Sequence, residues 1–173
     1  MKKVGIVFGC FIPLHEGHVK SMICPALEQN DEIILGVCGY DEDRGKTFLP
    51  FRKRIELMQK KYKKNKKVTI SVVDDRKIGL TGTFSEEAWR IWSNELFKNA
   101  GYNENEEDIT YTWYTGEDSY IEKLGKIFPH HKFKKLDRGK INISGTEIRN
   151  DPKKYVDVID KTFRDYLKEQ KLI

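Results

Sequence analysis

The chain has 173 residues, of which 38% are hydrophobic, 34% charged and 12% aromatic, and its formal net charge is +5. This composition excludes a collagen, a disordered tail and a membrane protein, and a chain of this length can bury a core of its own. The three cysteines form no C-x-x-C pair, which argues against a disulfide framework and for a reducing compartment. No apolar run approaches the roughly 20 residues that span a bilayer, so we expect a cytoplasmic protein without membrane contact.

Short apolar, β-branched runs alternate with helical patterns along most of the chain. The runs lie at residues 4–8, 33–37, 68–73 and 109–114. Helical spacing is found at 51–62, 84–97 and 119–127, and the acidic stretch 103–108 is expected to be a surface loop. This alternation predicts an α/β fold, a Rossmann-like open parallel sheet flanked by helices. We expect a single domain over 1–173, with a C-terminal helical part from about 150 to 173 that packs back on it.

Positive charge is concentrated in residues 52–67, with nine Lys or Arg against one Glu. Such a run is typical of a solvated helix face or of a surface that attracts phosphates or nucleic acid. Because Phe51, Ile55, Met58 and Tyr62 fall at helical spacing, we favour the solvated face of an amphipathic crossover helix. We expect no nucleic-acid partner, since no known nucleic-acid-binding signature accompanies the run.

The first predicted strand is followed by GCFIPLHEGH, residues 9–18, which carries two histidines three positions apart. Ligands of open parallel sheets bind at the carboxyl ends of the strands, so this turn lies where chemistry is expected. A helix pattern starts near Gly17, where backbone N–H groups favour anions and a glycine lets a phosphate approach closely. The pattern predicts that His15 and His18 face a bound phosphate.

A second polar turn, ISGTEIR, occupies residues 143–149, after the basic segment 132–140. Ser144 and Glu147 form a Ser-x-x-Glu capping box, which predicts a short helix beginning there. Arg149 follows one turn later, where its guanidinium could bind two phosphate oxygens or simply face solvent. Its pairing with the histidine turn favours the phosphate-binding role.

Together the two turns resemble those of the nucleotidyltransferases of the HIGH superfamily. In that superfamily the first strand ends in Gly-x-Phe-x-Pro-x-His-x-Gly-His and the last turn reads Ile-Ser-x-x-x-x-Arg. The matching residues here are Gly9, Phe11, Pro13, His15, Gly17, His18, Ile143, Ser144 and Arg149. With the segments WSN at 92–94 and YTGED at 114–118, the chain looks like the nicotinamide mononucleotide adenylyltransferase domain of NadR-type proteins.

The resemblance implies transfer of AMP from ATP to nicotinamide mononucleotide (NMN), giving NAD and pyrophosphate, with Mg²⁺ accompanying ATP and no metal held by protein ligands alone. It implies that His15, His18 and Arg149 are catalytic, because they would stabilise charge on the transferred and leaving phosphoryl groups. The residues that it places near ATP or its phosphates are Gly9, Phe11, Gly17, Arg52, Gly116 and Ser144.

For the nicotinamide nucleotide, the resemblance favours two residues of the predicted helix at 84–97. Trp92 is expected as a stacking platform, because an indole attracts a cationic pyridinium ring, although its place on the apolar face fits a core role equally well. Asn94 is expected to contact the carboxamide. Asp74 and Asp75, which end the third strand, have two interpretations: contact with Mg²⁺ or a ribose, or a turn cap.

Several alternatives stay open. A sister enzyme that adenylates pantetheine phosphate or cytidylates a sugar or choline phosphate would share the fold, although residues 137–145 lack the Arg-Thr-x-Gly-Ile-Ser signature of the cytidylyl branch. A non-catalytic nucleotide sensor is the other hypothesis, and a homo-oligomer is compatible with either. The loop GYDEDRGKT at 39–47 has Tyr40 where a phosphate-binding loop needs its first glycine, so we expect a flexible loop and no kinase site.

Overall fold

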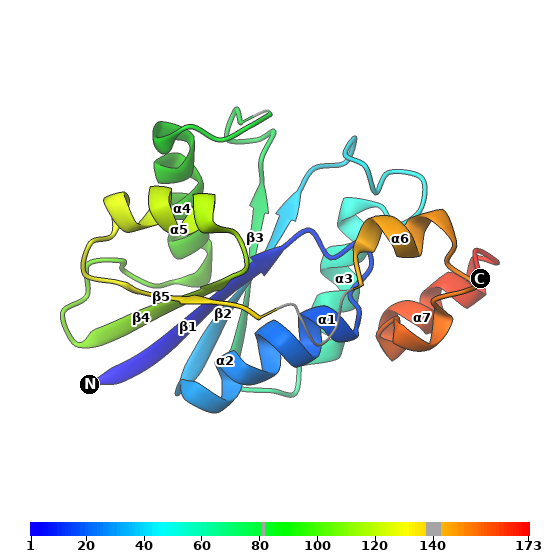
Figure 1. The fold of residues 1–173 in the computed structure, drawn as a ribbon, viewed down its shortest axis with the longest axis horizontal. Helices are drawn as coiled ribbons and strands as arrows, with labels where there is room; N and C mark the ends of the chain where they lie inside the picture. Colours follow the sequence, from blue (N-terminus) through cyan, green and yellow to red (C-terminus); the bar gives the residue numbers. More distant parts are fainter. Residues whose placement is uncertain (81, 138–142) are drawn as a thin grey trace.

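The computed structural model describes residues 1–80, 82–137 and 143–173. In this part of the chain five parallel strands form one sheet, in the order β3-β2-β1-β4-β5 (Figure 1). The strands are β1 Lys2–Gly9, β2 Glu32–Gly39, β3 Val68–Asp74, β4 Ile109–Thr115 and β5 Lys132–Lys135. Four of them contain the predicted runs, so the predicted Rossmann-like open parallel sheet is confirmed. The fifth is a short edge strand rich in lysine, which lies in the basic segment 132–140.

Helices connect the strands and cover both faces of the sheet. They are α1 Glu16–His18, α2 Cys24–Gln29, α3 Phe51–Tyr62, α4 Glu86–Ala100, α5 Asp118–Ile127, α6 Gly145–Asn150 and α7 Lys161–Glu169. A π-helical turn, Val19–Ile23, joins α1 to α2, and a 3₁₀ turn, Val156–Val158, precedes α7. The three helices predicted from apolar spacing correspond to α3, α4 and α5. The 3₁₀ turn and α7 form the predicted C-terminal helical part.

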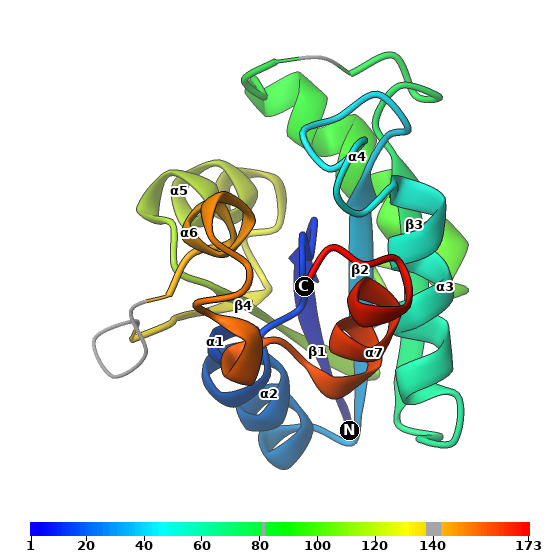
Figure 2. The same ribbon diagram turned by 90° about the vertical axis from the view of Figure 1, so that its right-hand side faces the viewer.

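The alternation of side chains along the strands divides the core into two layers. One layer lies between the sheet and the helices α2, α3, α6 and α7, and it includes Val7, Leu35, Met58, Ile148 and Phe163. The other lies under α4 and α5 and includes Ile6, Ile34, Trp92, Trp113 and Leu124. Figure 2 shows α7 beside α3, so the C-terminal part packs back on the first layer as expected.

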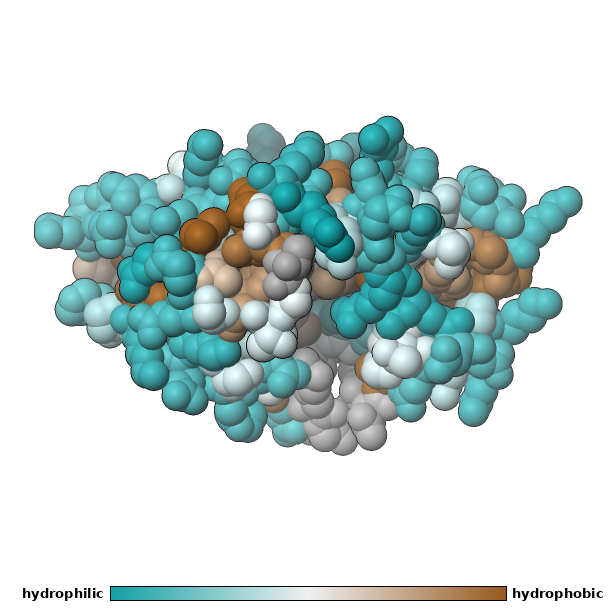
Figure 3. Space-filling model, turned by 90° about the horizontal axis from the view of Figure 1, so that it is seen from above, coloured by the Kyte–Doolittle hydropathy of each residue, from teal (hydrophilic) through white to brown (hydrophobic). Residues whose placement is uncertain are grey.

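The strand order reverses at β1, with β2 and β3 on one side of it and β4 and β5 on the other. The loops that follow β1 and β4 therefore diverge, and in open α/β sheets a ligand binds in the crevice that forms at this point. Figure 3 shows the molecule from above, and apolar residues gather near the middle of this view inside a hydrophilic surround.

The basic run 52–67 forms the exposed side of α3 and the loop that follows it. Part of its charge is paired within the protein: Lys53 bonds to Glu56, and Lys61 Nζ lies 2.5 Å from Asp160 Oδ1. The run forms the predicted amphipathic helix, and most of its basic side chains face solvent, whereas Arg54 is fully buried. In the described residues, no helix is both long and apolar enough to cross a membrane.

Candidate functional site

The two histidines after β1 are held by reciprocal hydrogen bonds with the backbone. His15 Nδ1 accepts the N–H of Gly17 at 3.0 Å, and His18 Nδ1 accepts the N–H of His15 at 3.3 Å. The two rings stack with their centroids 3.8 Å apart. Because both Nδ1 atoms act as acceptors, a neutral ring carries its proton on Nε2, which is then a hydrogen-bond donor. The predicted helix entry thus fixes the tautomer of both histidines.

Phe11 gives the same turn its shape. Its φ is +54°, in the left-handed region that residues other than glycine rarely adopt, and its side chain is 1% exposed. The ring meets His18 edge-on, with the centroids 5.1 Å apart. A Cβ atom on Gly9 would lie only 3.3 Å from the Phe11 ring, so Gly9 makes room for this conformation. Backbone strain of this kind costs on the order of 1 kcal/mol and is typical of functional turns.

The C-terminal part of the chain clamps the histidine turn from outside. The backbone N–H of Asp160 donates to the carbonyl of Leu14 at 3.0 Å, and His15 forms an isolated antiparallel bridge with Ile159. His15 is 3% exposed as a result, whereas His18 is half-buried.

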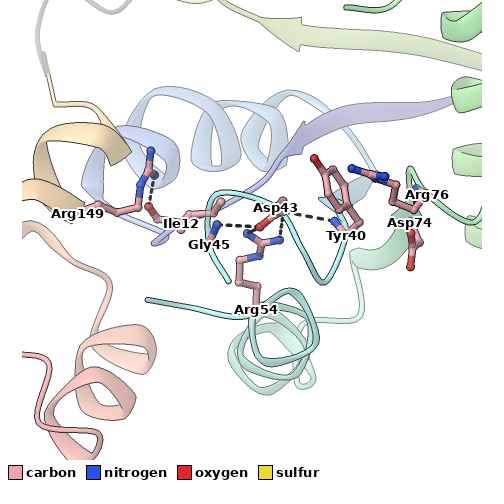
Figure 4. Close-up of polar contacts among 8 residues, drawn as sticks. All are labelled: Ile12, Tyr40, Asp43, Gly45, Arg54, Asp74, Arg76 and Arg149. Atoms are coloured by element: carbon pink, nitrogen blue, oxygen red, sulfur yellow. Dashed lines mark hydrogen bonds and ion pairs between the residues drawn. The ribbon is translucent and has the colours of Figure 1, made fainter. Parts of the chain in front are cut away.

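The second predicted turn meets the first one through Arg149. Ser144 caps α6 and forms the predicted capping box with Glu147. The Arg149 guanidinium donates to the carbonyl of Ile12 at 2.8 Å (Figure 4). It also donates to Thr146 Oγ1 at 3.1 Å. One hydrogen bond therefore joins two motifs that lie 137 residues apart in the sequence.

A pocket of about 400 Å³ opens between the two turns. Six predicted site residues line it, namely Phe11, His15, Gly17, His18, Ser144 and Arg149. Glu117, which lies within the segment 116–118 expected to line the nucleotide site, also lines it. Sequence reasoning missed other lining residues, among them Cys10, Arg44 and Tyr120. All three follow β1, β2 or β4 closely, so the rule that ligands bind at the carboxyl ends of parallel strands was the signal that could have found them.

The remaining predicted phosphate contacts lie outside the pocket lining. Gly9 lies behind the Phe11 ring, and Gly116 comes between the end of β4 and Glu117, which does line the pocket. Arg52 is exposed on α3, whereas Arg54 of the same helix is fully buried and directed toward the end of β2. The phosphate-binding role of Arg52 stays a prediction.

The two residues predicted for nicotinamide lie on opposite sides of α4. Trp92 is 2% exposed and packs against Phe8 and Trp89, with ring centroids 4.9 and 5.4 Å away. Asn94 is exposed, because residues two positions apart point to opposite sides of a helix. Neither lines the pocket, and their contacts with a nicotinamide nucleotide stay predictions.

A buried ion pair holds the loop that carries Arg44 to the pocket. The Asp43 side chain is 8% exposed and that of Arg54 is 0% exposed, and the two pair through both guanidinium Nη atoms. Asp43 also accepts the backbone N–H groups of Tyr40 and Gly45 (Figure 4). The loop 39–47, which was expected to be flexible, is therefore tied to α3 through one carboxylate.

Burial shifts the pKa values of two side chains in this region, Arg149 and Asp75. Burial, reinforced by the nearby positive charge of Arg44, lowers the pKa of Arg149. Burial also raises the pKa of Asp75 to about 7, and its Oδ1 atom is buried with no hydrogen-bond partner among the described residues. Asp74 caps a turn by accepting the N–H groups of Arg76 and Lys77, which agrees with one of its two interpretations.

Replacing Arg54 by Met leaves the Asp43 carboxylate buried without its counter-charge. Because breaking a buried ion pair from one side is costly, we expect the free energy of unfolding to fall by about 3–5 kcal/mol in urea denaturation. Trypsin should also cleave after Arg44 and Lys46 faster than in the parent, because their loop loses its anchor. Lys60→Met, at an exposed position of the same helix, is the control and should change neither measurement. Equal midpoints for both variants would contradict the anchoring role.

The Asp75 carboxyl group stays protonated up to a higher pH in the folded protein than in the unfolded chain. Replacing Asp75 by Asn removes this group. Its pKa rises from 3.8 to about 7 on folding, so the parent loses stability as the pH rises through this window. Because the side chain is partly exposed, solvent screening limits the expected gain from Asn to about 1–2 kcal/mol near pH 8, declining toward zero near pH 4. Urea denaturation across this range measures it. The same gain at both ends of the range would show that Asp75 does not titrate in this way.

The comparisons with known proteins agree with this geometry. The family model described as Cytidylyltransferase-like matches residues 6–151. The Trifunctional NAD biosynthesis/regulator protein NadR of Escherichia coli (strain K12) is 29% identical over 181 residues, and that of Salmonella typhimurium (strain LT2) is 31% identical over 185 residues. Each match covers 91% of this chain and 39% of the relative, so the chain spans about two fifths of the length of these relatives.

This chain also resembles solved structures of NadR over most of its length. NadR in complex with NR has a TM-score of 0.80 at 33% identity, and the match covers 94% of this chain and 44% of that chain. NadR in complex with NAD and AMP-PNP has a TM-score of 0.76 at 32% identity, covering 94% and 46%. A bifunctional NMN adenylyltransferase/ADP ribose pyrophosphatase from Francisella tularensis, complexed with AMP and a manganese ion, has the same fold, with a TM-score of 0.64 at 20% identity and coverage of 94% and 44%. The expected similarity to NadR-type proteins is confirmed, and the chain belongs to the cytidylyltransferase-like family of nucleotidyltransferases.

Proposed function

We propose that this nucleotidyltransferase transfers AMP from ATP to NMN, forming NAD and pyrophosphate. The observation that carries the proposal is the hydrogen bond between Arg149 and Ile12, which joins the two turns predicted to bind phosphate at the edge of one pocket. The similarity to NadR, whose solved structures contain NR, NAD and AMP-PNP, supports a nicotinamide nucleotide as the second substrate.

The reaction needs no covalent enzyme intermediate. A phosphate oxygen of NMN attacks the α-phosphorus of ATP, the bond between the α-phosphorus and the bridging oxygen breaks, and pyrophosphate leaves. The nucleophile is already an anion at neutral pH, so the barrier arises mostly from charge repulsion and misorientation. The protein therefore acts by aligning the two substrates and by supplying positive charge and hydrogen-bond donors.

The residues of the pocket divide this work by position. The Nε2–H groups of His15 and His18 would donate to oxygens of the α-phosphoryl group, where charge builds up in the transition state. Arg149 and the first N–H groups of α6 would hold the β- and γ-phosphates. Arg44 would contribute a second guanidinium from the opposite loop. Phosphate binding would then offset the repulsion between the two arginines.

We propose that Mg²⁺ accompanies ATP on the phosphate oxygens, where it would neutralise part of the phosphate charge. Among the described residues, no three His, Cys, Asp or Glu side chains are grouped so that they could hold a metal ion. The pocket offers cationic and N–H donor groups, which suit a phosphate chain that brings its own metal ion.

The proposed reaction predicts pyrophosphate release from ATP and Mg²⁺ when NMN is present, with NAD as the product. Nicotinate mononucleotide, phosphopantetheine, and CTP with choline phosphate should be tested separately in the same assay. We expect NMN to be the preferred acceptor. Turnover only with phosphopantetheine, or only with choline phosphate, would agree with the proposed phosphate site but contradict NMN as the acceptor substrate. ATP binding without turnover in any mixture would favour the nucleotide sensor.

The proposed role of His18 predicts the effect of His18→Asn. An Asn side chain retains an acceptor near the Nδ1 position, which can receive the N–H of His15, but it has no donor at the Nε2 position. We expect kcat to fall about 100- to 1,000-fold, as happens when a donor to a developing negative charge is removed, while the protein stays folded. His130→Asn changes an exposed histidine after α5 and is the matched control. Similar kcat values for the two variants would remove His18 from the mechanism.

A further inference from the structure

Two of the three cysteines meet at the carboxyl ends of neighbouring strands. Gly9 of β1 pairs with Val37 of β2 in parallel register, so Cys10 and Cys38 are the next pair along the two chains. Cys10 directly follows β1, and the usual spacing of about 4.8 Å between neighbouring strands lies within the Cα separations that a disulfide can bridge. A hydrogen-bonding interaction between the two thiols is the main cause of the shift in the pKa of each.

The two thiols have different surroundings. Cys10 lines the pocket of about 400 Å³ and can be reached from it, whereas Cys38 is buried behind it among apolar side chains of the α4 layer. Cys24, the third cysteine, is exposed at the start of α2 and does not line the pocket. The chain therefore contains one accessible thiol with a buried partner and one exposed thiol for comparison.

The charges around the pair make Cys10 the more acidic thiol. The hydrogen bond from Cys38 lowers the pKa of Cys10 to about 6, and the guanidinium groups of Arg44 and Arg54 act in the same direction, whereas burial and Asp43 oppose them. The hydrogen bond and burial raise the pKa of Cys38 well above its ordinary value, and the Asp75 carboxylate adds to this rise. At neutral pH the pair thus combines a Cys10 thiolate with a Cys38 thiol.

The proposed adenylyl transfer gives this thiolate no task, because no covalent enzyme intermediate forms. An accessible thiolate next to a second thiol is the arrangement found in cysteines that react with oxidants. We propose that Cys10 and Cys38 form a peroxide-reactive dithiol site in the wall of the nucleotide pocket, where Cys10 is the attacking residue and Cys38 the resolving residue.

The proposed reaction has two balanced steps. The Cys10 thiolate attacks one oxygen of hydrogen peroxide, an S–O bond forms, the O–O bond breaks, and hydroxide leaves. The Cys38 sulfur then attacks the sulfenic acid on Cys10, the S–S bond forms, the S–O bond breaks, and the oxygen leaves as water with the Cys38 proton. In total, one thiolate and one thiol lose two electrons, and one hydrogen peroxide is reduced to one hydroxide and one water. The disulfide removes a negative charge from the pocket wall and links β1 to β2.

Peptide mapping of the full chain tests this site without reference to turnover. The protein is treated with hydrogen peroxide, the remaining thiols are blocked with N-ethylmaleimide under denaturing conditions, and the chain is cleaved after glutamate. Glu16, Glu28, Glu32 and Glu42 then place Cys10, Cys24 and Cys38 in the separate peptides 1–16, 17–28 and 33–42.

We expect peptides 1–16 and 33–42 to be joined by a disulfide that dithiothreitol reduces, while peptide 17–28 keeps its maleimide adduct. Two results would overturn the proposal. In the first, Cys24 is oxidised as early as the pair or earlier. In the second, Cys10 and Cys38 are both recovered as maleimide adducts. The parent protein alone gives this result, so the test does not depend on the folding of a variant.

Three variants assign the roles within the pair. Cys38→Ser should stop at the sulfenic acid, which dimedone traps on peptide 1–16. Cys10→Ser should slow the oxidation of Cys38 by at least about 10-fold, because the reactive thiolate is lost. Cys24→Ser is the matched control and should form the same disulfide as the parent. Oxidation of Cys38 at the parent rate in Cys10→Ser would show that Cys10 is not the attacking residue.

Discussion

The candidate site depends on the position of β1 in the sheet. Because β1 lies where the strand order reverses, the chain leaves it toward β2 on one side and returns to β4 on the other. Right-handed crossovers in opposite directions place their helices on opposite faces, which is why α2 and α3 pack in one core layer and α4 and α5 in the other. The end of β1 is left between diverging loops, and the histidine turn occupies this position.

Two arginine side chains that lie close to one another line the pocket. Arg149 reaches it from α6 and Arg44 from the loop after β2, and the proximity of the two guanidinium groups contributes to the lowered pKa of Arg149. Such an arrangement is unfavourable unless hydrogen bonds or a ligand offset the repulsion. The Ile12 carbonyl holds Arg149, and the Asp43–Arg54 pair fixes the loop that carries Arg44. The electrostatics of the pocket thus match a polyanion such as a triphosphate.

The parts of this site that could be predicted from sequence are those fixed by local chemistry. The apolar runs, the helix 51–62 and the capping box at Ser144 each depend on neighbouring residues, and the structure contains all of them. The proximity of Cys10 and Cys38 depends on strand register, which the intervening residues 11–37 do not reveal. Arg44 was missed for a related reason, because its direction is set by Asp43 and the distant Arg54.

Helical phase explains why the nicotinamide residues are harder to place than the phosphate residues. Apolar spacing in α4 predicted a core position for Trp92, whereas the resemblance favoured a ligand platform at the same residue, and the structure buries its side chain against Phe8. The two turns predicted to bind phosphate are easier to place, because their glycine and capping residues define a helix N-terminus from neighbouring residues alone.

The basic helix α3 contributes to the site through Asp160. This carboxylate accepts Lys61 Nζ and the N–H of Thr162 at the start of α7, while its own backbone N–H donates to Leu14 in the histidine turn. One residue thus joins α3, α7 and the turn that carries His15. Part of the positive charge that suggested a phosphate or nucleic-acid surface therefore supports the C-terminal clamp. The packing of α7 beside α3 thereby helps to fix the position of the turn that carries His15.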